Sequence, residues 1–275
     1  MIGLLPGKTA IVVHNNEDTD ATFPHLPNLI IHPSRKDWRW FCNGFLFASG
    51  WSNLSPVQRR VLNFLKEHGT KIILSEYLDY SLKWIDVARK QGILFFAHAH
   101  GYDVSKTLRD PAMRRQYLRL DEADGIITMS EVSRQRLIEL GLNSHKIHVI
   151  PYGIDVQDQC PKHETKDVVY CLAVGRMVGK KAPLNTLKAF QQAFIHNSKL
   201  RLDYIGEGEL YPEAVQFVRH YTLEPFVKLH GAQPNSVVQK YMKNADIFIQ
   251  HSITDPETGD EEGLPVAILE AMSGG

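Results

Sequence analysis

The chain has few cysteines, no run of charges of one sign and no long apolar stretch. Its 275 residues include three cysteines, Cys42, Cys160 and Cys171, without Cys-x-x-Cys spacing, which favours reduced thiols over disulfides or structural zinc. The 31 Lys and Arg residues balance the 31 Asp and Glu residues, so charge gives no support for nucleic acid as a partner. We recognise no membrane-spanning run and no cleavable signal. A cytoplasmic protein is expected, with peripheral contact at the inner face of a membrane left open.

Apolar strands and amphipathic helices alternate along most of the chain. A domain usually has about 100–200 residues, so the length suits two domains. The alternation predicts parallel β-α-β units with helices on both faces of each sheet. Residues 157–167 are polar, carry Pro161 and lack periodicity, and they are predicted to be a linker. The expected fold class is α/β, with two Rossmann-like, doubly wound domains at residues 1–156 and 168–275.

Helix caps and apolar runs locate the individual elements. Ser55 and Ser130 are expected to cap helices, and Gly92 and Gly141 to end them. We predict strands at residues 9–14, 71–74, 93–97, 125–129, 146–150, 168–174, 200–205, 227–229 and 247–250, and helices at 56–67, 81–90, 111–122, 131–140, 184–194, 210–221, 235–244 and from Pro265 onward. Ligands of such sheets bind at the carboxyl ends of the strands, so the loops that follow strands are the candidate sites.

Arg176 and Lys181 follow a predicted strand in a glycine-containing loop. Both cations can reach one point at the end of that strand, where a diphosphate needs positive partners. A solvated loop with ordinary basic residues is the alternative. The next loop along the same edge contains Gly206-Glu207-Gly208. Such a tripeptide is by default a tight turn, so only its position supports a role in binding.

Residues 255–275 combine an acidic loop with a short apolar helix that opens at Gly263-Leu264-Pro265. The unpaired N–H groups of a helix start favour anions, and proline suits the first turn. Glu262 and Glu270 flank this start, and each carboxylate can accept hydrogen bonds from a sugar diol. The helix dipole alone accounts for Glu262, whereas an unpaired carboxylate at position 270, in an apolar turn, would be costly.

His98 and His100 follow a predicted strand with His-x-His spacing. Two such imidazoles could be metal ligands, but the later strand ends offer Ser130, Tyr152 and Arg176 rather than further ligands. We predict no metal at this site. For His98 we favour a hydrogen-bonded core histidine, and for His100 a turn that offers one imidazole to a substrate.

Taken together, these segments resemble a known family. The paired glutamates, with seven residues between them, and the Arg-Lys loop are its more specific features. The resemblance is to retaining GT-B glycosyltransferases of family 4, especially bacterial enzymes of exopolysaccharide or lipopolysaccharide synthesis. It is carried by Gly175-Arg176 with Lys181, Gly206-Glu207-Gly208, Glu262-Gly263-Leu264-Pro265 with Glu270-Ala271-Met272, His100-Gly101-Tyr102-Asp103, Thr128-x-Ser130 and Pro151-Tyr152-Gly153-Ile154-Asp155.

The resemblance implies a role for each candidate residue. Residues 1–156 would face the acceptor and residues 168–275 would bind the nucleotide-sugar donor, with a cleft between them. His100 and Glu262 would be catalytic. Donor binding would involve Arg176, Lys181, Gly206, Glu207, Gly263, Leu264 and Glu270. The partners would be a nucleoside-diphosphate sugar and a glycan or lipid-linked acceptor, with no cofactor and no metal.

Two departures from the family pattern leave alternatives open. The usual glycine-rich loop after the first strand is replaced by residues 15–22, which are polar, and family members continue past Gly275, so we expect an incomplete second domain. A catalytically inactive fragment that retains nucleoside-diphosphate binding is the second hypothesis. A metal-dependent hydrolase that uses His98 and His100 is the third.

Overall fold

The computed structural model describes residues 11–14, 28–31, 54–154, 156 and 167–274. Cα packing groups the described residues into two compact units. One contains the residues up to His98 together with Arg119–Ile126, and the other contains Ala99–Leu118 together with the residues from Ile127 onward. The expected polar loop 15–22, Cys42 and Cys160 fall outside the described residues. Most of the expected linker also falls outside them, and the limits 1–156, 157–167 and 168–275 stay a prediction.

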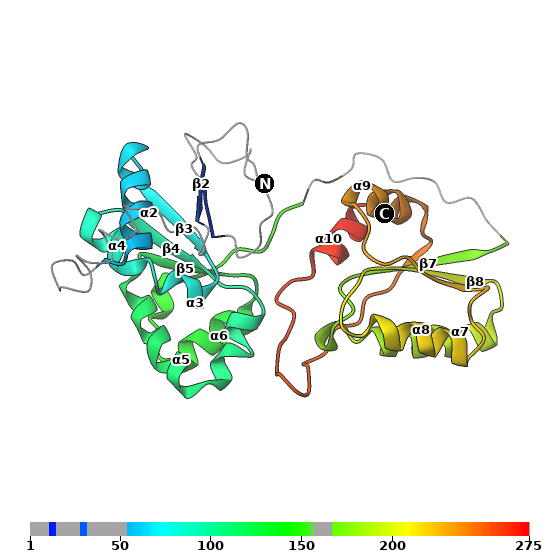
Figure 1. Ribbon diagram of the computed structural model, residues 1–275. Coiled ribbons are helices and arrows are strands. Elements are labelled where there is room, and N and C mark those ends of the chain that lie inside the picture. Colours follow the sequence, from blue (N-terminus) through cyan, green and yellow to red (C-terminus); the bar gives the residue numbers. More distant parts are fainter. Residues whose placement is uncertain (1–10, 15–27, 32–53, 155, 157–166, 275) are drawn as a thin grey trace. The chain divides into compact units, whose positions relative to one another are not determined.

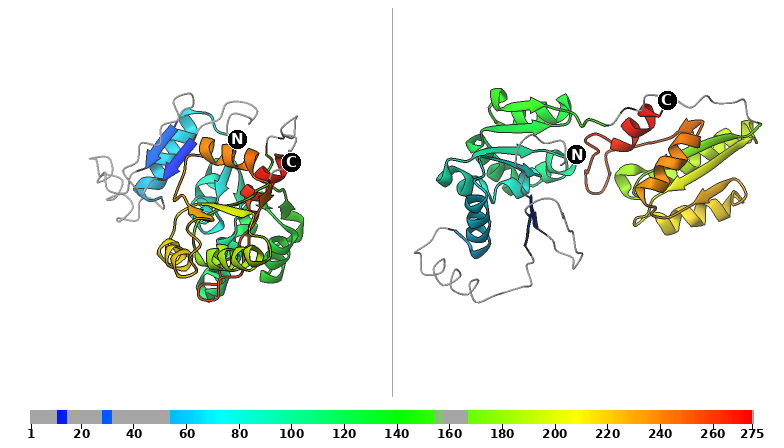
Figure 2. Two further views of the ribbon diagram at one scale, coloured as in Figure 1. Left: turned by 90° about the vertical axis from the view of Figure 1, so that its right-hand side faces the viewer. Right: turned by 90° about the horizontal axis from the view of Figure 1, so that it is seen from above.

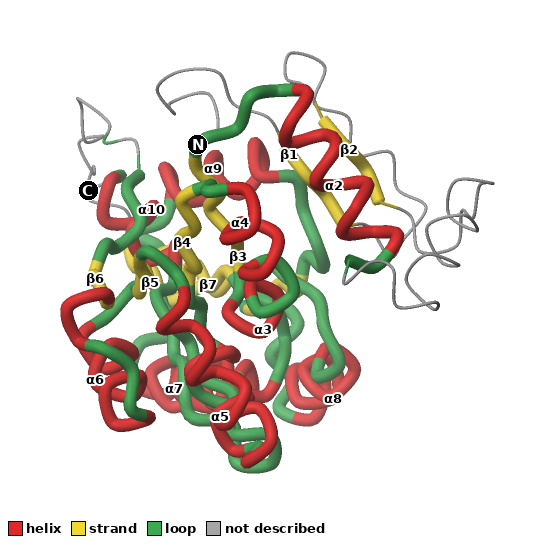
Figure 3. Tube along the Cα trace, turned by 90° about the vertical axis from the view of Figure 1, so that its left-hand side faces the viewer, coloured by secondary structure: helices red, strands yellow, loops and turns green. Residues whose placement is uncertain are grey.

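The first unit begins with a small parallel pair, β1 (Ile11–His14) and β2 (Asn28–Ile31). Strand β1 was expected and β2 was not. Helix α2 (Pro56–Glu67) lies beside the pair (Figure 3). Its start is a capping box: the Ser55 hydroxyl accepts from the Gln58 N–H at 3.2 Å, and the Gln58 side chain accepts from the Ser55 N–H at 2.9 Å. These bonds satisfy N–H groups that a helix start leaves unpaired, which is why the sequence signal was reliable.

A four-stranded sheet has the order β3-β4-β5-β6. The strands are β3 (Ile72–Glu76), β4 (Leu94–His98), β5 (Gly125–Thr128) and β6 (Ile147–Val149). Strands β3 and β4 are parallel, with Glu76 opposite His98. The accompanying helices are α3 (Leu78–Ser81), α4 (Ile85–Gln91), α5 (Pro111–Tyr117) and α6 (Glu131–Leu140), with 3₁₀ turns at Tyr102–Val104, Thr107–Arg109, Leu118–Glu122 and Ser144–Lys146.

Two helix predictions in this part were wrong in detail. The single helix expected at residues 81–90 is two helices, α3 and α4, separated at residues 82–84. Between them the N–H groups of Lys83 and Trp84 donate to the carbonyls of Tyr80 and Ser81 at 3.1 and 2.9 Å, three residues back rather than four, which interrupts the α-helical pairing. The helix expected at 111–122 ends at Tyr117 and continues as a 3₁₀ turn. By contrast, α6 begins after Ser130 and ends before the left-handed Gly141 as predicted.

The second sheet has the order β10-β7-β8-β9, and all its neighbours are parallel. Its strands are β7 (Val169–Val174), β8 (Leu200–Ile205), β9 (Val227–Leu229) and β10 (Ile247–Phe248). Helices α7 (Pro183–His196) and α8 (Tyr211–His220) lie on one face and α9 (Asn235–Asn244) on the other (Figures 1 and 2). The predicted α/β class with helices on both faces of a parallel sheet is confirmed. Helix α10 (Val266–Ser273) follows the acidic loop.

The two faces of this sheet are packed unequally. The larger apolar cluster fills the side of α7 and α8 and includes Leu187, Phe190, Leu202 and Val218. The smaller cluster, under α9, has Leu172, Ile205 and Val238 as its buried members. The face of α7 and α8 therefore provides most of the apolar burial that holds the strand ends, and the loops after them, in place. No helix in the described ranges is both long and apolar enough to cross a bilayer.

Replacing Leu187 by alanine tests this assignment of the core. Leu187 is fully buried on α7, whereas Ile195 on the same helix is 73% exposed. Leu187→Ala is expected to lower the free energy of unfolding by about 2–5 kcal/mol, because it removes buried apolar contacts and leaves a cavity. Ile195→Ala is the matched control and should change it by less than about 0.5 kcal/mol. Urea unfolding followed by circular dichroism measures both, and equal effects would contradict the assignment.

Candidate functional site

The loop after β7 and the acidic loop before α10 are joined by an ion pair. The Lys181 ammonium lies 2.7 Å from the Glu262 carboxylate, and the two side chains are only 14% and 21% exposed. Lys181 lies in a 3₁₀ turn (Gly179–Lys181) directly before α7. Two predicted site residues, 81 positions apart in the sequence, are therefore in contact within the second unit.

Lys180 makes a second connection between the same two loops. Its ammonium lies 3.1 Å from Asp260 Oδ2 and donates to the Glu261 carbonyl at 3.4 Å. The Ile253 N–H donates to the Lys180 carbonyl at 2.9 Å. A side chain at Gly179 would collide with the Asp255 carboxylate. The acidic loop is thus docked on the β7 loop along several residues, so the position of Glu262 is set by its neighbours as well as by Lys181.

The acidic loop has its own internal support at Asp255. This buried carboxylate accepts from the Thr258 N–H at 2.8 Å and the Glu257 N–H at 3.0 Å. Hydrogen bonding from Thr258, the largest influence, holds the pKa of Asp255 below its usual value. Because these N–H groups bond the charged form, Asp255 keeps the loop folded back on itself at neutral pH.

The turn after β4 also packs against the acidic loop. A side chain at Gly101 would collide with the Glu261 carbonyl, and it would lie 2.9 Å from the Gly263 nitrogen. The Ser105 hydroxyl donates to the Gly101 carbonyl at 2.8 Å and accepts from the Glu261 N–H at 3.1 Å. Only a glycine allows this approach of one backbone to another, so the absence of a side chain at position 101 brings His100 next to the segment that carries Glu262.

His100 is oriented by two polar contacts. Its backbone N–H donates to the fully buried Asp103 carboxylate at 2.7 Å. Its ring Nδ1 lies 2.7 Å from the Tyr152 hydroxyl. Tyr152 follows β6, so residues after two strands meet here. If the tyrosine hydroxyl donates to Nδ1, the neutral ring carries its proton on Nε2 and presents a donor there.

His98 is the last residue of β4. It is 7% exposed, and its Nδ1 lies 2.8 Å from the Glu76 carboxylate. Glu76 is the residue opposite His98 on the neighbouring strand. His98 is thus buried and hydrogen-bonded, but the choice between a core histidine and a metal ligand stays a prediction, because one ligand atom each of Glu76, His98 and His100 lie within 4.8 Å of one another.

The Gly206-Glu207-Gly208 segment is a tight turn that supports the β7 loop. Gly206 has a φ of 147°, and a side chain there would collide with the Gly175 carbonyl. The Glu207 carbonyl accepts from the Met177 N–H at 2.8 Å. The Glu207 side chain is exposed. The turn contributes backbone contacts that fix the loop between Gly175 and Lys181.

Three predicted residues are not tied into these contacts. Arg176 is exposed and has no side-chain hydrogen bond or ion pair to any described residue. Glu270 is half-buried on α10 and likewise lacks such a bond within the described ranges. Leu264 is half-buried just before the helix.

Pro265 is the residue before α10, with extended backbone, rather than its first helical residue as expected. The helix therefore begins one residue later than predicted.

Several residues that support the site were missed from the sequence. Lys180, Asp260 and Glu261 are charged residues next to predicted site residues, and no spacing distinguishes them from solvated neighbours. Arg136 on α6 lies 2.7 Å from the Glu261 carboxylate. A lone arginine on an amphipathic helix carries no signal for such a distant partner. Tertiary contacts alone identify these four.

The Arg136 guanidinium lowers the pKa of Glu261. Its side-chain hydrogen bond is the largest influence, burial acts in the opposite direction, and Thr254, which donates at 3.0 Å, adds to the lowering. The carboxyl group thus stays charged at neutral pH and holds the acidic loop against α6.

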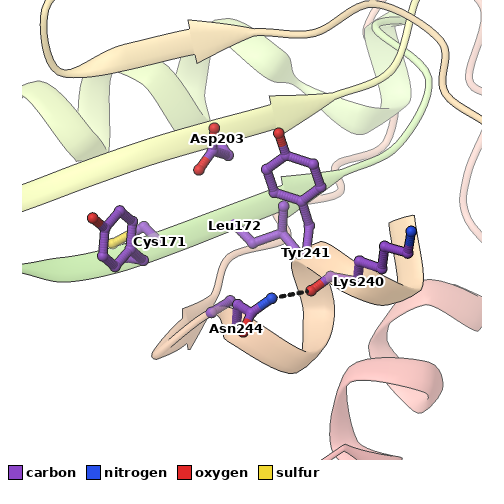
Figure 4. Close-up of a pocket in the computed structure, with 8 residues that line it drawn as sticks. Cys171, Leu172, Asp203, Lys240, Tyr241 and Asn244 are labelled. Atoms are coloured by element: carbon purple, nitrogen blue, oxygen red, sulfur yellow. Dashed lines mark hydrogen bonds between the residues drawn. The ribbon is translucent and has the colours of Figure 1, made fainter. Parts of the chain in front are cut away.

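A separate cavity of about 260 Å³ lies between α9 and strands β7 and β8 (Figure 4). Cys171 and Leu172 from β7, Asp203 from β8 and Tyr241 from α9 line it. Burial, with a smaller contribution from Asp246, raises the pKa of the Cys171 thiol, which makes it a poor nucleophile. The lining comes from within β7 and β8 and from α9 rather than from the loops after the strands, so this cavity is not the candidate site.

Two family models together match the chain from residue 11 to its end. The model described as Glycosyltransferase Family 4 matches residues 11–158, and the one described as Glycosyl transferases group 1 matches residues 156–275. The amylovoran biosynthesis glycosyltransferase AmsK of Erwinia amylovora is 29% identical over 181 residues, covering 64% of this chain and 44% of that protein. The putative colanic acid biosynthesis glycosyltransferase WcaL of Escherichia coli (strain K12) is 27% identical over 179 residues, with the same coverage. The chain spans less than half the length of these relatives.

Solved structures support the same fold. Anabaena HepE, in complex with UDP and glucose, matches with a TM-score of 0.69 at 16% identity over 91% of this chain and 66% of that chain. The lipopolysaccharide outer core galactosyltransferase WaaB, in its apo form, matches with a TM-score of 0.62 at 19% identity over 94% of this chain and 66% of that chain. The similarity in fold agrees with the Rossmann-like domains expected from the sequence.

The contact between Arg136 and Glu261 can be measured by a double-mutant cycle. Arg136→Gln, Glu261→Gln and the double variant should give a coupling of about 1 kcal/mol in the free energy of unfolding at pH 7, the upper end for partly exposed pairs. The folded-state pKa of Glu261 is lowered, so this stabilisation is present above its unfolded pKa of about 4.3 and is lost as pH falls through the folded value.

Urea unfolding between pH 3 and pH 7 measures this coupling. The same cycle with Arg134 and Glu131, an exposed pair within α6 at 2.8 Å, is the control and should give less than about 0.5 kcal/mol. A coupling for Arg136 and Glu261 that is no larger than the control, or that grows as pH falls, would contradict the contact.

Proposed function

Because this chain belongs to glycosyltransferase family 4, we propose that it transfers a sugar from a nucleoside-diphosphate sugar to a glycan or lipid-linked acceptor. The setting we propose is cell-envelope or exopolysaccharide synthesis. Relatives named for amylovoran and colanic acid biosynthesis support this setting, and the HepE complex with UDP and glucose supports the class of donor. The observation that carries the proposal is the contact between Lys181 and Glu262 at the edge where β7 ends.

The ion pair between Lys181 and Glu262 suits a lysine that exchanges its carboxylate partner for a bound diphosphate. A half-buried lysine without a counter-ion would be costly, and Glu262 supplies that counter-ion at 2.7 Å. A donor diphosphate would replace the carboxylate on Lys181, since phosphate oxygens are strong acceptors for an ammonium group. The displaced Glu262 would then be available to the hydroxyl groups of the transferred sugar.

The other predicted donor residues fit the same arrangement. Arg176 is exposed in the loop that carries Lys181, so its guanidinium can reach a second phosphate oxygen. Gly263 and Leu264 precede α10, whose first N–H groups favour an anion. Glu270 would accept from the ribose, and the turn at Gly206 and Glu207 would hold the β7 loop. We propose that these groups, without metal or cofactor, neutralise the leaving diphosphate.

The proposed transfer retains the configuration of the sugar. The bond between the anomeric carbon and the diphosphate oxygen breaks, with its electron pair going to that oxygen. The acceptor hydroxyl forms the new bond to the anomeric carbon, and its proton passes to the departing diphosphate. The residues contribute by electrostatic stabilisation: Arg176 and Lys181 at the diphosphate, and Glu262 with the His100 imidazole at the sugar.

Removing the two cations tests the donor site. Arg176→Gln and Lys181→Met should each weaken binding of the nucleoside diphosphate about 10- to 100-fold, since a hydrogen bond to a charged group contributes about 1.5–3 kcal/mol. Lys188→Met is the matched control, because Lys188 is an exposed lysine on α7. Calorimetric titration with uridine and guanosine diphosphates gives the affinities, and a panel of nucleotide sugars, assayed for transfer and for hydrolysis, gives the activity.

The same experiment separates the alternatives. Unchanged affinity in both variants, together with no turnover of any donor, would refute the proposal. Binding that needs Arg176 and Lys181 without turnover would favour the nucleotide-binding alternative. Stoichiometric zinc, iron or manganese, together with donor-independent hydrolysis lost in His98→Ala, would favour the hydrolase.

Tyr152→Phe tests the orientation of His100. Loss of the hydroxyl removes the contact to Nδ1, so the ring loses the bond that selects its tautomer. The turnover number is expected to fall about tenfold, in keeping with the loss of about 1.4 kcal/mol of transition-state stabilisation, while donor affinity changes less than twofold. Tyr170→Phe, an exposed tyrosine at the start of β7, is the control. Equal losses in turnover and in donor affinity would contradict an orienting role.

A further inference from the structure

A second cavity, of about 260 Å³, is lined by three arginines. Arg109 comes from the 3₁₀ turn at Thr107–Arg109, Arg114 from α5 and Arg136 from α6. The acidic loop completes the wall with Gly259 and Glu261. We call this cavity the arginine pocket. Its volume is several times the roughly 30 Å³ that a water molecule takes up in the liquid, and somewhat below the roughly 300 Å³ at which small-molecule sites begin.

The charges in the arginine pocket are not balanced. Arg136 is paired with Glu261 at 2.7 Å, and the Glu139 carboxylate accepts from Gln135 at 3.1 Å. In the part of the chain that the structure describes, neither Arg109 nor Arg114 has a side-chain hydrogen bond or an ion pair. Arg109 also lies close enough to Glu261 to help lower the pKa of that carboxyl group, so Glu261 is shared by two arginines. Three guanidinium groups and two carboxylates therefore line the cavity, which leaves capacity for an anion.

Gly259 holds one of these guanidinium groups in place. The Arg109 guanidinium occupies the position where a side chain at residue 259 would stand. Gly259 has a φ of 70°, and its N–H donates to the Asp255 carbonyl at 2.8 Å. The backbone of the acidic loop thus supports the flat face of Arg109. A supported guanidinium loses less conformational freedom when it binds an oxyanion than a solvated one does.

Consecutive glutamates separate the arginine pocket from the proposed donor cations. Glu261 points to Arg136 and lines the pocket, whereas Glu262 points to Lys181. The Ser105 hydroxyl, which also lines the pocket, bonds both the Gly101 carbonyl and the Glu261 N–H. Adjacent residues of the acidic loop therefore contact the arginine pocket and the proposed donor cation Lys181.

We propose that the arginine pocket binds an anionic oxygen group of the acceptor, a phosphate or a carboxylate. This inference rests on the proposed glycosyl transfer, which already assigns the donor diphosphate to Arg176 and Lys181 and leaves a second anion site for the other substrate. Guanidinium groups bind phosphate and carboxylate through paired N–H donors, and two of them facing one cavity suit a group with two or three acceptor oxygens. An acceptor anchored there lies beside the segment that carries Glu262.

Calorimetric titrations with inorganic pyrophosphate, glucuronate and glucose test the inference. In the wild-type chain at low ionic strength, pyrophosphate or glucuronate is expected to bind and glucose is not. Pyrophosphate mimics a phosphate-bearing acceptor and glucuronate a carboxylate-bearing one, so the probe that binds identifies the source of the anion. Arg109→Gln with Arg114→Gln should weaken that binding at least tenfold. Arg115→Gln is the matched control, since Arg115 is an exposed neighbour on α5 outside the pocket.

A second variant separates this inference from the proposed function. Arg176→Gln with Lys181→Met should abolish uridine diphosphate binding. It should leave glucuronate binding intact or, if pyrophosphate is the probe that binds, the pyrophosphate binding that persists in excess uridine diphosphate. If anion binding is lost only in this variant, or falls equally in Arg115→Gln, the arginine pocket is not the site. If the anion needs Arg109 and Arg114 while no nucleoside diphosphate binds, the anion site stands and the donor assignment fails. Circular dichroism melting of each variant confirms that it is folded.

Discussion

The docking of the acidic loop on the β7 loop is the constraint on which the candidate site depends. Residues 253–262 make no strand or helix, so their position is set by contacts rather than by regular pairing. Lys180 bonds the Asp260 carboxylate and the Glu261 carbonyl, and Lys181 bonds Glu262. Gly179 provides the space for Asp255. Without these contacts the segment would be a surface loop, and Glu262 would have no defined place relative to the end of β7.

Consecutive residues of like charge have different partners of opposite charge. In the β7 loop, Lys180 and Lys181 bond successive parts of the acidic loop. In the acidic loop, Asp260, Glu261 and Glu262 turn to Lys180, Arg136 and Lys181 in that order. A net charge of zero over the chain thus conceals a local arrangement of paired opposite charges. Such pairs fix geometry at half-buried positions, where an unpaired charge would be costly.

Most of the fold could be predicted from the sequence because its signals are local. Strands β8 and β9 and helices α6 and α9 have the bounds expected from apolar runs and caps. One error came where the backbone pairing changes within an otherwise helical pattern, at Lys83 and Trp84, whose N–H groups bond carbonyls three residues back. Strand β2 is four residues long and gains its partner only by pairing with β1, so its sequence gives little warning of it.

The site could be predicted in part, for a related physical reason. Lys181, Glu262 and His100 lie in loops after strands or before a helix, and parallel sheets place such loops at one edge. Arg136 and Ser105 could not be found this way, because each acts on the acidic loop through a contact with residues more than 120 positions away. Glycines mark these contacts indirectly. Gly101, Gly179 and Gly259 each stand where another backbone or side chain needs the space of a Cβ atom.

Two of these glycines let the acidic loop pack closely against two different partners. At Gly179 the freed space admits Asp255, which anchors the loop toward the proposed donor cations, and at Gly259 it admits Arg109, which belongs to the arginine pocket. A β-carbon at either position would push apart elements that the ion pairs draw together. The acidic loop is therefore held from both sides by charge and by close approach. Because Glu261 and Glu262 are adjacent in the chain, the ion pairs with Arg136 and Lys181 fix each other's position.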